Sequence, residues 1–353
     1  MFNKRWLRGQ IRSGRIINKL GDIMPKKHNP RRGSLQFWPR CRAKSESVRI
    51  RNFVGSKDAG LLGFAGYKVG MTHLIITDNR TKATTKGEEI FCPGTIIECP
   101  PLRISSIRFY KKDVYGKKLF SEVMNPKLEK EVAKTLPIPK KAGKKLEDIK
   151  LEDIDEIRVN VYTQPKKLCT GKKKPEVFEI ALGGTKEDQL NFVKENLPKE
   201  IPVSSVLKEG SQYDAHSVTK GKGFQGATKR FGLMLKNHKS EKKKRAPGNL
   251  GPWHPAKISF RVPQPGQMGY HTRTEYNKWL LKISNNPTEI NKDSGFKRYG
   301  IVKNDYIIVK GSVGGPSKRL IKFTIAQRPN KQIPGEVPAI EYIDIRTKDQ
   351  NEN

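Results

Sequence analysis

The chain has 353 residues, and its 71 lysine and arginine residues against 35 aspartate and glutamate residues give a formal net charge of +36 at pH 7. Such a charge destabilises a compact state through self-repulsion, so it indicates a polyanionic partner: RNA, DNA or an anionic membrane. A membrane partner is excluded, because the sequence has neither a long apolar run nor a strongly amphipathic basic helix.

Residues 1–23 are basic and nearly free of acids, a composition that an amphipathic presequence also has, but they lack the apolar core of a secretory signal. Met24 follows and begins a different segment, MPKKHNPRRGSLQFWPR. We therefore interpret residues 1–23 as a basic leader upstream of the functional chain, which begins at Met24.

Residues 24–51 combine three prolines with a dense series of cations, and no core can form from them. They are either a solvated, disordered tail or a basic arm that becomes ordered on phosphates. Phe37 and Trp38 are available to stack on bases or to pack on protein. We favour the basic arm.

Strand patterns divide the rest of the chain. Short apolar runs parted by Gly, Pro and charged turns predict the first part of an all-β unit over 52–110, and its recurrent glycines suit a small, tightly curved barrel. After a return segment (201–217) and a long basic stretch (218–273), strand signals reappear at 306–310, 319–326 and 339–345, within a second β part over 274–347. A short tail, 348–353, follows.

Between the two β parts, residues 111–200 have the character of an inserted α/β module. Apolar residues alternate over 157–161 and 178–182, which predicts two strands. Thr185 and Asp188 have the spacing of a capping box, and Leu190, Val193 and Leu197 follow at helical spacing, so one amphipathic helix closes the module. The length of the chain allows such an insertion, or alternatively two cores.

The stretch 218–273, here called the finger, contains many cations and a single acid, Glu241. A solvated face has charges of both signs, whereas cations held at phosphates release counterions and bind with a steep salt dependence. Frequent glycines and prolines exclude a long regular element, and a loop of this length in a compact protein is usually functional or disordered. We expect an extended RNA-binding segment.

Within the finger, GKGFQG (Gly221–Gly226) formally matches the dinucleotide fingerprint, which requires a preceding strand, a following helix and an acid about 20 residues later. Lysines occupy that downstream region. A loop on RNA phosphates explains the same residues, but an RNA-modifying or nucleotide-dependent factor remains the alternative function.

The histidines of the finger, His238, His254 and His271, have no carboxylate or cysteine at ligand spacing, and the four cysteines of the chain do not form a CxxC zinc motif. We expect no metal, no cofactor and no catalytic residue, with free thiols in a reducing cytoplasm. The histidines then stack on RNA or hydrogen-bond to it. Trp253, in GPWHP, has no apolar periodicity around it and predicts an exposed, stacking indole.

The string GNLGPWHPAKISFRVPQPGQMGYHTRTEYN (248–277), with RRGSLQFWPR and VTKGKGFQG, resembles the archaeal and eukaryotic form of the ribosomal large-subunit protein three family, over Met24 to about Thr347. The resemblance implies a mainly β fold: a closed six-stranded barrel like that of translation factors, an inserted α/β module and two extended RNA-penetrating segments. It further implies a structural, non-enzymatic role in the cytoplasmic ribosome.

The same resemblance implies that the finger extends toward the peptidyl transferase centre with Trp253 at its tip, and that the protein aids subunit assembly. Its partners would be large-subunit ribosomal RNA and neighbouring ribosomal proteins, with no membrane and no small-molecule substrate. His238 stands where some eukaryotic members carry a methylated histidine. The predicted RNA-binding residues are Arg31, Arg32, Arg40, Lys220, Lys222, Lys229, Arg230, Lys236, His238, Lys239, Lys242, Lys243, Lys244, Arg245, Trp253, His254, Lys257, Arg261, His271 and Arg273.

Overall fold

The computed structural model describes residues 31–139, 143, 146, 149, 154–240 and 242–345. The described residues form two compact units: unit 1 contains 31–41 and 222–268, and unit 2 contains 42–221 and 269–345. The predicted leader (1–23), the first residues of the arm (24–30) and the tail (348–353) lie outside the described residues.

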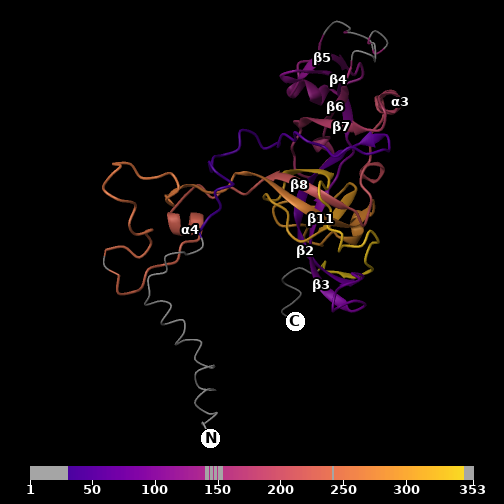
Figure 1. Cartoon of the computed structure of the whole chain (residues 1–353). Helices are drawn as coiled ribbons and strands as arrows, with labels where there is room; N and C mark the ends of the chain where they lie inside the picture. Colours follow the sequence, from indigo (N-terminus) through magenta and orange to yellow (C-terminus); the bar gives the residue numbers. More distant parts are fainter. Residues whose placement is uncertain are drawn as a thin grey trace. The chain divides into compact units, whose positions relative to one another are not determined.

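Unit 2 contains a closed ring of six antiparallel strands, in the order β13-β8-β11-β12-β3-β2, with β13 also paired to β2 (Figure 1). A seventh strand, β14 (Ile340–Ile343), pairs with the outer end of β2. The ring strands are β2 (Gly63–Thr77), β3 (Glu89–Glu98), β8 (Gln212–Val218), β11 (Thr272–Ser284), β12 (Tyr306–Lys310) and β13 (Leu320–Ile325). The strands predicted at 306–310, 319–326 and 339–345 are thus confirmed as β12, β13 and β14.

The second sheet of unit 2 has five strands in the order β1-β7-β6-β4-β5. Its strands are β1 (Gly60–Leu61), β4 (Arg103–Asp113), β5 (Gly116–Met124), β6 (Glu156–Tyr162) and β7 (Val177–Gly183). The alternating runs at 157–161 and 178–182 are confirmed as β6 and β7. Most of β4 falls within 52–110, the range predicted as the first part of the β unit, yet β4 pairs with β5 and β6 of this sheet.

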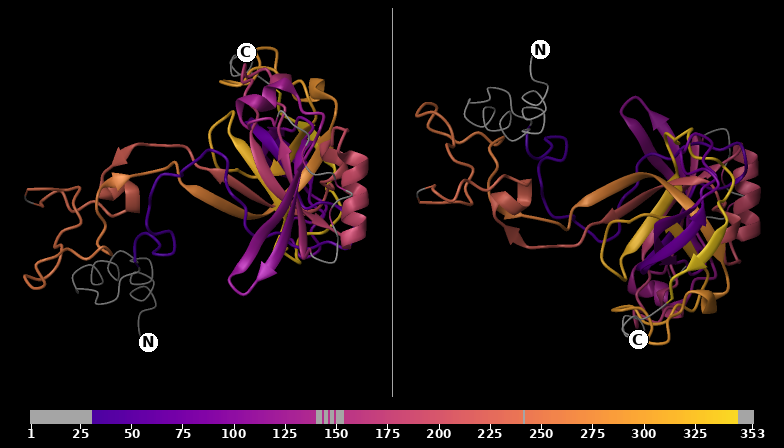
Figure 2. Two further views of the ribbon diagram at one scale, coloured as in Figure 1. Left: turned by 90° about the horizontal axis from the view of Figure 1, so that it is seen from above. Right: turned by 90° about the horizontal axis from the view of Figure 1, so that it is seen from below.

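One α-helix covers part of this sheet (Figure 2). The helix α3 (Lys186–Asn196) begins at the predicted capping box, where the Thr185 side chain accepts a hydrogen bond from the Asp188 backbone and the Asp188 side chain accepts one from the Thr185 backbone. Val193, a residue of this helix, is fully buried. The short 3-10 helices of unit 2 are η1 (Lys130–Lys134), η3 (Pro165–Lys167), η4 (Val203–Ser205) and η5 (Pro287–Glu289).

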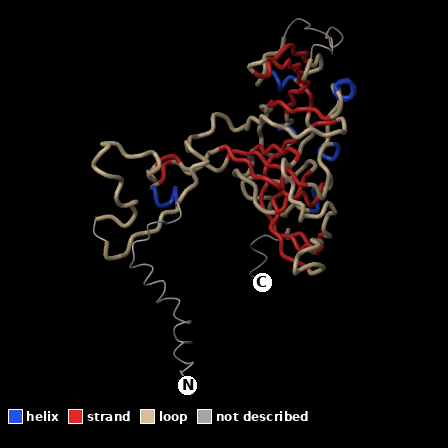
Figure 3. The backbone as a smooth tube through the Cα atoms, viewed as in Figure 1, coloured by secondary structure: helices blue, strands red, loops and turns tan. Residues whose placement is uncertain are grey.

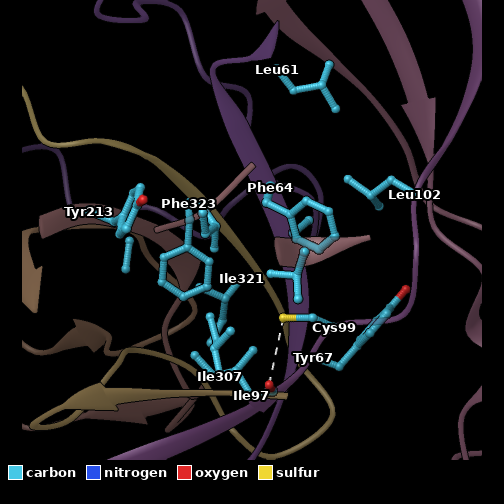
Figure 4. Packing of buried hydrophobic residues seen from close by; sticks show 14 of the residues in the cluster. Leu61, Phe64, Tyr67, Ile97, Cys99, Leu102, Tyr213, Ile307, Ile321 and Phe323 are labelled. Carbon is cyan, nitrogen blue, oxygen red and sulfur yellow. Dashed lines mark hydrogen bonds between the residues drawn. The ribbon is translucent and has the colours of Figure 1, made fainter. Parts of the chain in front are cut away.

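The core of the ring consists of aromatic and branched side chains that converge from different strands (Figure 4). Phe64 of β2 and Phe323 of β13 are each 1% exposed. Gly66 allows the close approach of β2 and β3, because a Cβ at this position would lie 2.9 Å from the Glu98 carbonyl oxygen and nearer still to Cys99 Sγ. Tyr67 of β2 donates its hydroxyl hydrogen to Oε2 of Glu176, the residue directly before β7 of the second sheet, at 2.6 Å.

Unit 1 has little regular structure, as its glycines and prolines predict. It contains the helix α4 (Ala227–Phe231) and a two-stranded ribbon of β9 (Phe224–Gln225) and β10 (Gly266–Gln267). Gly232 ends α4 in the left-handed conformation, at φ 67°. The described residues between Gly232 and Gly266 have neither helix nor strand and are drawn as loop in Figure 3. No helix in the described part of the chain could span a membrane.

Candidate nucleic-acid interface

Most of the predicted RNA-binding residues are exposed side chains of unit 1. Over 31–41 and 222–268, the sequence of this unit has one acid, Glu241, which lies outside the described residues, against many lysines and arginines. Most of these cations can therefore neutralise phosphates without first breaking an ion pair to a carboxylate of the same unit. The exposed residues of this group are Arg31, Arg32, Lys222, Lys229, Lys236, His238, Lys239, Lys242, Lys243, Lys244, Arg245, Trp253, His254, Lys257 and Arg261.

Arg230 has a different role within unit 1. Its guanidinium donates hydrogen bonds to the carbonyl oxygens of Gln267, at 3.0 Å, and Gln264, at 2.9 Å. Burial lowers the pKa of this guanidinium below its usual value. Arg230 therefore connects α4 to residues 264–267 near the C-terminal end of the finger. This internal contact was not predicted from the sequence.

Two cations of the arm are also bound to the backbone of the finger. Arg31 Nη2 donates to the carbonyl oxygen of Arg261 at 2.7 Å, and Arg40 Nη1 donates to that of Arg230 at 2.6 Å. Both contacts lie within unit 1, so residues 31–41 fold with the finger. The charge of each guanidinium is retained, because a carbonyl oxygen is a neutral acceptor.

An aromatic cluster holds the arm and the finger segments together. The Trp38 ring stacks on Phe231 with centroids 5.7 Å apart and meets the edge of Phe260 at 5.9 Å. The Arg40 guanidinium carbon lies 4.2 Å from the centroid of the Phe231 ring. Of the two roles open to Trp38 from the sequence, packing on protein is the one observed. The participation of Phe231 and Phe260 was missed, because both lie about 200 residues away in the sequence.

Trp253 is 87% exposed, as predicted for an indole without an apolar surrounding. Its neighbours over 251–260 are exposed as well, including His254. An indole ring this exposed can stack on a nucleic-acid base. Stacking of Trp253 on RNA stays a prediction.

The remaining three predicted residues, Lys220, His271 and Arg273, belong to unit 2. Lys220 is exposed, whereas His271 is only 8% exposed and its backbone N–H donates to Thr219 Oγ1 at 3.1 Å. Arg273 is half-buried, and burial lowers the pKa of its guanidinium. His271 and Arg273 therefore present less surface to a ligand than the sequence suggested.

The local structure does not favour a nucleotide site at GKGFQG. β8, which precedes this segment, is antiparallel to both of its neighbours, β11 and β13, whereas the dinucleotide fingerprint requires parallel strands joined by a helical crossover. The strand β9 inside the segment pairs with β10, and α4 has only five residues. Among the described residues, no group of three or more His, Cys, Asp or Glu side chains is placed to hold a metal ion.

Comparison with known proteins adds a family to this geometry. The sequence model of the family "Ribosomal protein L3" matches residues 24–351. The large ribosomal subunit protein uL3 of Methanothrix thermoacetophila is 45% identical over 329 residues, covering 91% of this chain and 98% of the relative. The proteins of the same name from Archaeoglobus fulgidus and Methanocaldococcus jannaschii are 46% and 44% identical, covering 87% and 91% of this chain and 94% and 98% of the relatives.

Proposed function

The chain belongs to the ribosomal protein L3 family, and from this premise we propose that it binds large-subunit ribosomal RNA through unit 1 and aids assembly of the large ribosomal subunit. As a member of this family it is a structural constituent of the ribosome and not an enzyme. The family relationship removes the alternative of an RNA-modifying or nucleotide-dependent factor.

The observation that supports RNA binding most directly is the charge of unit 1. Its described residues carry many exposed lysines and arginines and no acid. Folded RNA places phosphates of neighbouring helices close together, and interposed cations reduce their mutual repulsion. The composition of unit 1, with Glu241 as its single acid over 31–41 and 222–268, suits this role, whereas an ordinary solvated surface has charges of both signs.

The finger would extend toward the peptidyl transferase centre, with the exposed indole of Trp253 at its tip. In this proposal Trp253 stacks against RNA and stabilises one arrangement near the transfer centre, while catalysis stays with the RNA. The cations that we assign to phosphates are the exposed residues of unit 1 together with Lys220. Arg40, Arg230, His271 and Arg273 would act at the interface while also holding the protein's own backbone or core.

For the architecture, we propose that the six-stranded ring is a closed barrel of the translation-factor type. The five-stranded sheet with α3 would be the inserted α/β module, and the arm and the finger would be the two RNA-penetrating extensions. Segments 52–110, 201–217 and 274–347 would supply the barrel and 111–200 the insertion, with β4 crossing the boundary between them.

The partners in this proposal are large-subunit ribosomal RNA and neighbouring ribosomal proteins, in cytoplasmic ribosomes, without a small-molecule substrate. Sedimentation tests it. The full chain should cosediment with the large subunit after a moderate salt wash, and its affinity for isolated large-subunit RNA should fall steeply, by roughly 10³-fold or more, between about 50 and 200 mM salt. A chain that remains at the top of the gradient, or an affinity that does not respond to salt, would overturn the proposal.

A further inference from the structure

A second group of exposed cations lies on the hairpin formed by β4 and β5, in unit 2. β4 pairs with β6 only as far as Tyr110, opposite Glu156, whereas its pairing with β5 continues to Asp113, opposite Gly116. Residues 111–118 therefore form a two-stranded ribbon beyond the end of β6, and all of them are exposed, as are Leu119 and Phe120 directly after them. Figure 2 shows the ribbon, in magenta, projecting from the sheet.

Lysine faces lysine at two successive positions of this ribbon. Lys111 lies directly opposite Lys118, and Lys112 directly opposite Lys117. Like charges in directly opposed cross-strand positions destabilise a sheet. Because successive residues of a strand point to opposite faces, one lysine pair lies on each face of the ribbon.

Ion pairs offset part of this charge. Asp113 forms an ion pair with Lys118, and Glu156 forms one with Lys117. The lysine side chains of these pairs are 67% and 52% exposed, so solvent screens both interactions and each contributes little. By sequence, residues 111–120 contain four lysines and one acid, Asp113.

Apolar side chains are interleaved with the lysines. Val114 and Tyr115 form the two-residue turn between β4 and β5, and each is 94% exposed. Leu119 and Phe120 are about half exposed, at 49% and 51%. An isolated two-stranded ribbon is marginally stable in water, and exposed apolar residues rimmed by polar ones mark interaction sites.

We propose that the β4–β5 ribbon is a second RNA-binding element, which enters a groove of folded RNA. Lysines on both faces would meet phosphates on both walls of the groove, and the Tyr115 ring at the turn would stack on a base. RNA is favoured over an acidic protein, because lysines lie on both faces of the ribbon, and a groove has phosphates on both of its walls whereas a protein surface would reach one face only. The identity of the RNA as ribosomal rests on the proposed function.

The test compares two charge-matched variants of the full chain. K111Q/K112Q/K117Q/K118Q removes the ribbon's lysines, and the control K82Q/K86Q/K173Q/K174Q removes four exposed lysines from other loops of unit 2. Affinity for isolated large-subunit RNA is measured from about 50 to 200 mM salt. Each phosphate contact contributes about 0.7–0.9 to the slope of log affinity against log salt, so removal of four contacts should take roughly 3 from the slope and reduce the affinity at least about tenfold near 0.1 M.

The control variant should change both quantities much less. Equal losses in the two variants would reduce the effect to net charge and overturn the inference, as would an unchanged slope in the ribbon variant. Thermal unfolding controls for misfolding: because the substitutions remove like-charge repulsion, the ribbon variant should not melt below the parent. Failure of the parent itself to bind RNA would refute the proposed function instead.

Crosslinking identifies the macromolecule at the turn. A photoreactive amino acid replaces Tyr115, and the full chain is assembled into large subunits before irradiation. We expect crosslinks to ribosomal RNA. Crosslinks exclusively to another protein would show that the ribbon is a protein-docking element and would overturn the inference.

Discussion

Replacing Trp38 with alanine should release the arm from the finger within unit 1. The substitution removes the stack on Phe231 at 5.7 Å and the edge contact with Phe260 at 5.9 Å. Aromatic pairs contribute about 0.5–1.5 kcal/mol each beyond area burial, so the loss is about 2 kcal/mol for the two pairs. Since 1.4 kcal/mol corresponds to a factor of ten, the population with an undocked arm should rise roughly 30-fold.

Limited trypsin digestion of the RNA-free chain measures this population. The peptide bond after Arg40 is protected while Arg40 Nη1 donates to the Arg230 carbonyl oxygen, and it becomes cleavable when the arm undocks. When opening and closing are faster than cleavage, the cleavage rate follows the open population. We therefore expect Trp38→Ala to accelerate cleavage after Arg40 roughly 30-fold.

The matched control is Leu35→Ala, which removes an exposed apolar side chain three residues earlier in the same segment. It should change the cleavage rate less than about threefold, as surface substitutions usually change stability by no more than about 0.5 kcal/mol. Equal rates for the parent and Trp38→Ala would refute the reasoning, because they would mean that the aromatic cluster does not hold the arm.

Three further predictions concern Trp253 at the proposed tip of the finger, residues 239–245 in its middle, and the buried Lys322 of unit 2. Trp253→Ala should leave large-subunit assembly normal and alter the rate of transfer-RNA accommodation in rapid kinetics; unchanged accommodation in assembled ribosomes would contradict a role for the indole. Deletion of 239–245 should impair assembly in sucrose gradients and leave the melting temperature unchanged, because none of the described residues in this segment is buried; a lower melting temperature would count against it. Burial lowers the pKa of Lys322 from 10.5 to about 7. Between about pH 7 and 10.5, Lys322 is therefore protonated in the unfolded chain and neutral in the folded one. The free energy of unfolding of the parent should then rise with pH, relative to Lys322→Met, by up to about 1.4 kcal/mol per unit above pH 7, measured by denaturant titration at several pH values; parallel pH profiles for the two proteins would rule this out.

The features that were predictable from the sequence are encoded by neighbouring residues. The helix α3 follows from the reciprocal contacts of Thr185 and Asp188 and from the spacing of its apolar residues. The strand β12 follows from a short apolar run between turns, and its observed bounds, Tyr306–Lys310, coincide with those predicted. In both cases the signal lies within about a dozen residues, where periodicity and capping act.

The features that were missed depend on contacts between distant segments. The ring closes by pairing β13 with β2, for example Phe323 with Phe64, and β1 joins the second sheet through Leu61 opposite Leu182. Alternation predicts that a strand has a buried face but does not specify its partner. The contact of Trp38 with Phe231 is of the same kind, because a single aromatic residue in a basic segment has no periodicity that indicates what it packs against.

The two units also differ in how their charge is compensated, and this difference predicts where the chain meets polyanions. On the second sheet of unit 2, Arg158 pairs with Glu156 at 2.7 Å and with Glu179 at 3.0 Å, so its charge is balanced within the fold. Over 31–41 and 222–268, unit 1 has a single acid in its sequence, Glu241, so most of its cations cannot be balanced in the same way. Total charge alone therefore overestimates the number of phosphate contacts, because paired cations release few counterions. The salt dependence of RNA binding should come mainly from unit 1, and secondarily from the β4–β5 ribbon, where lysine faces lysine.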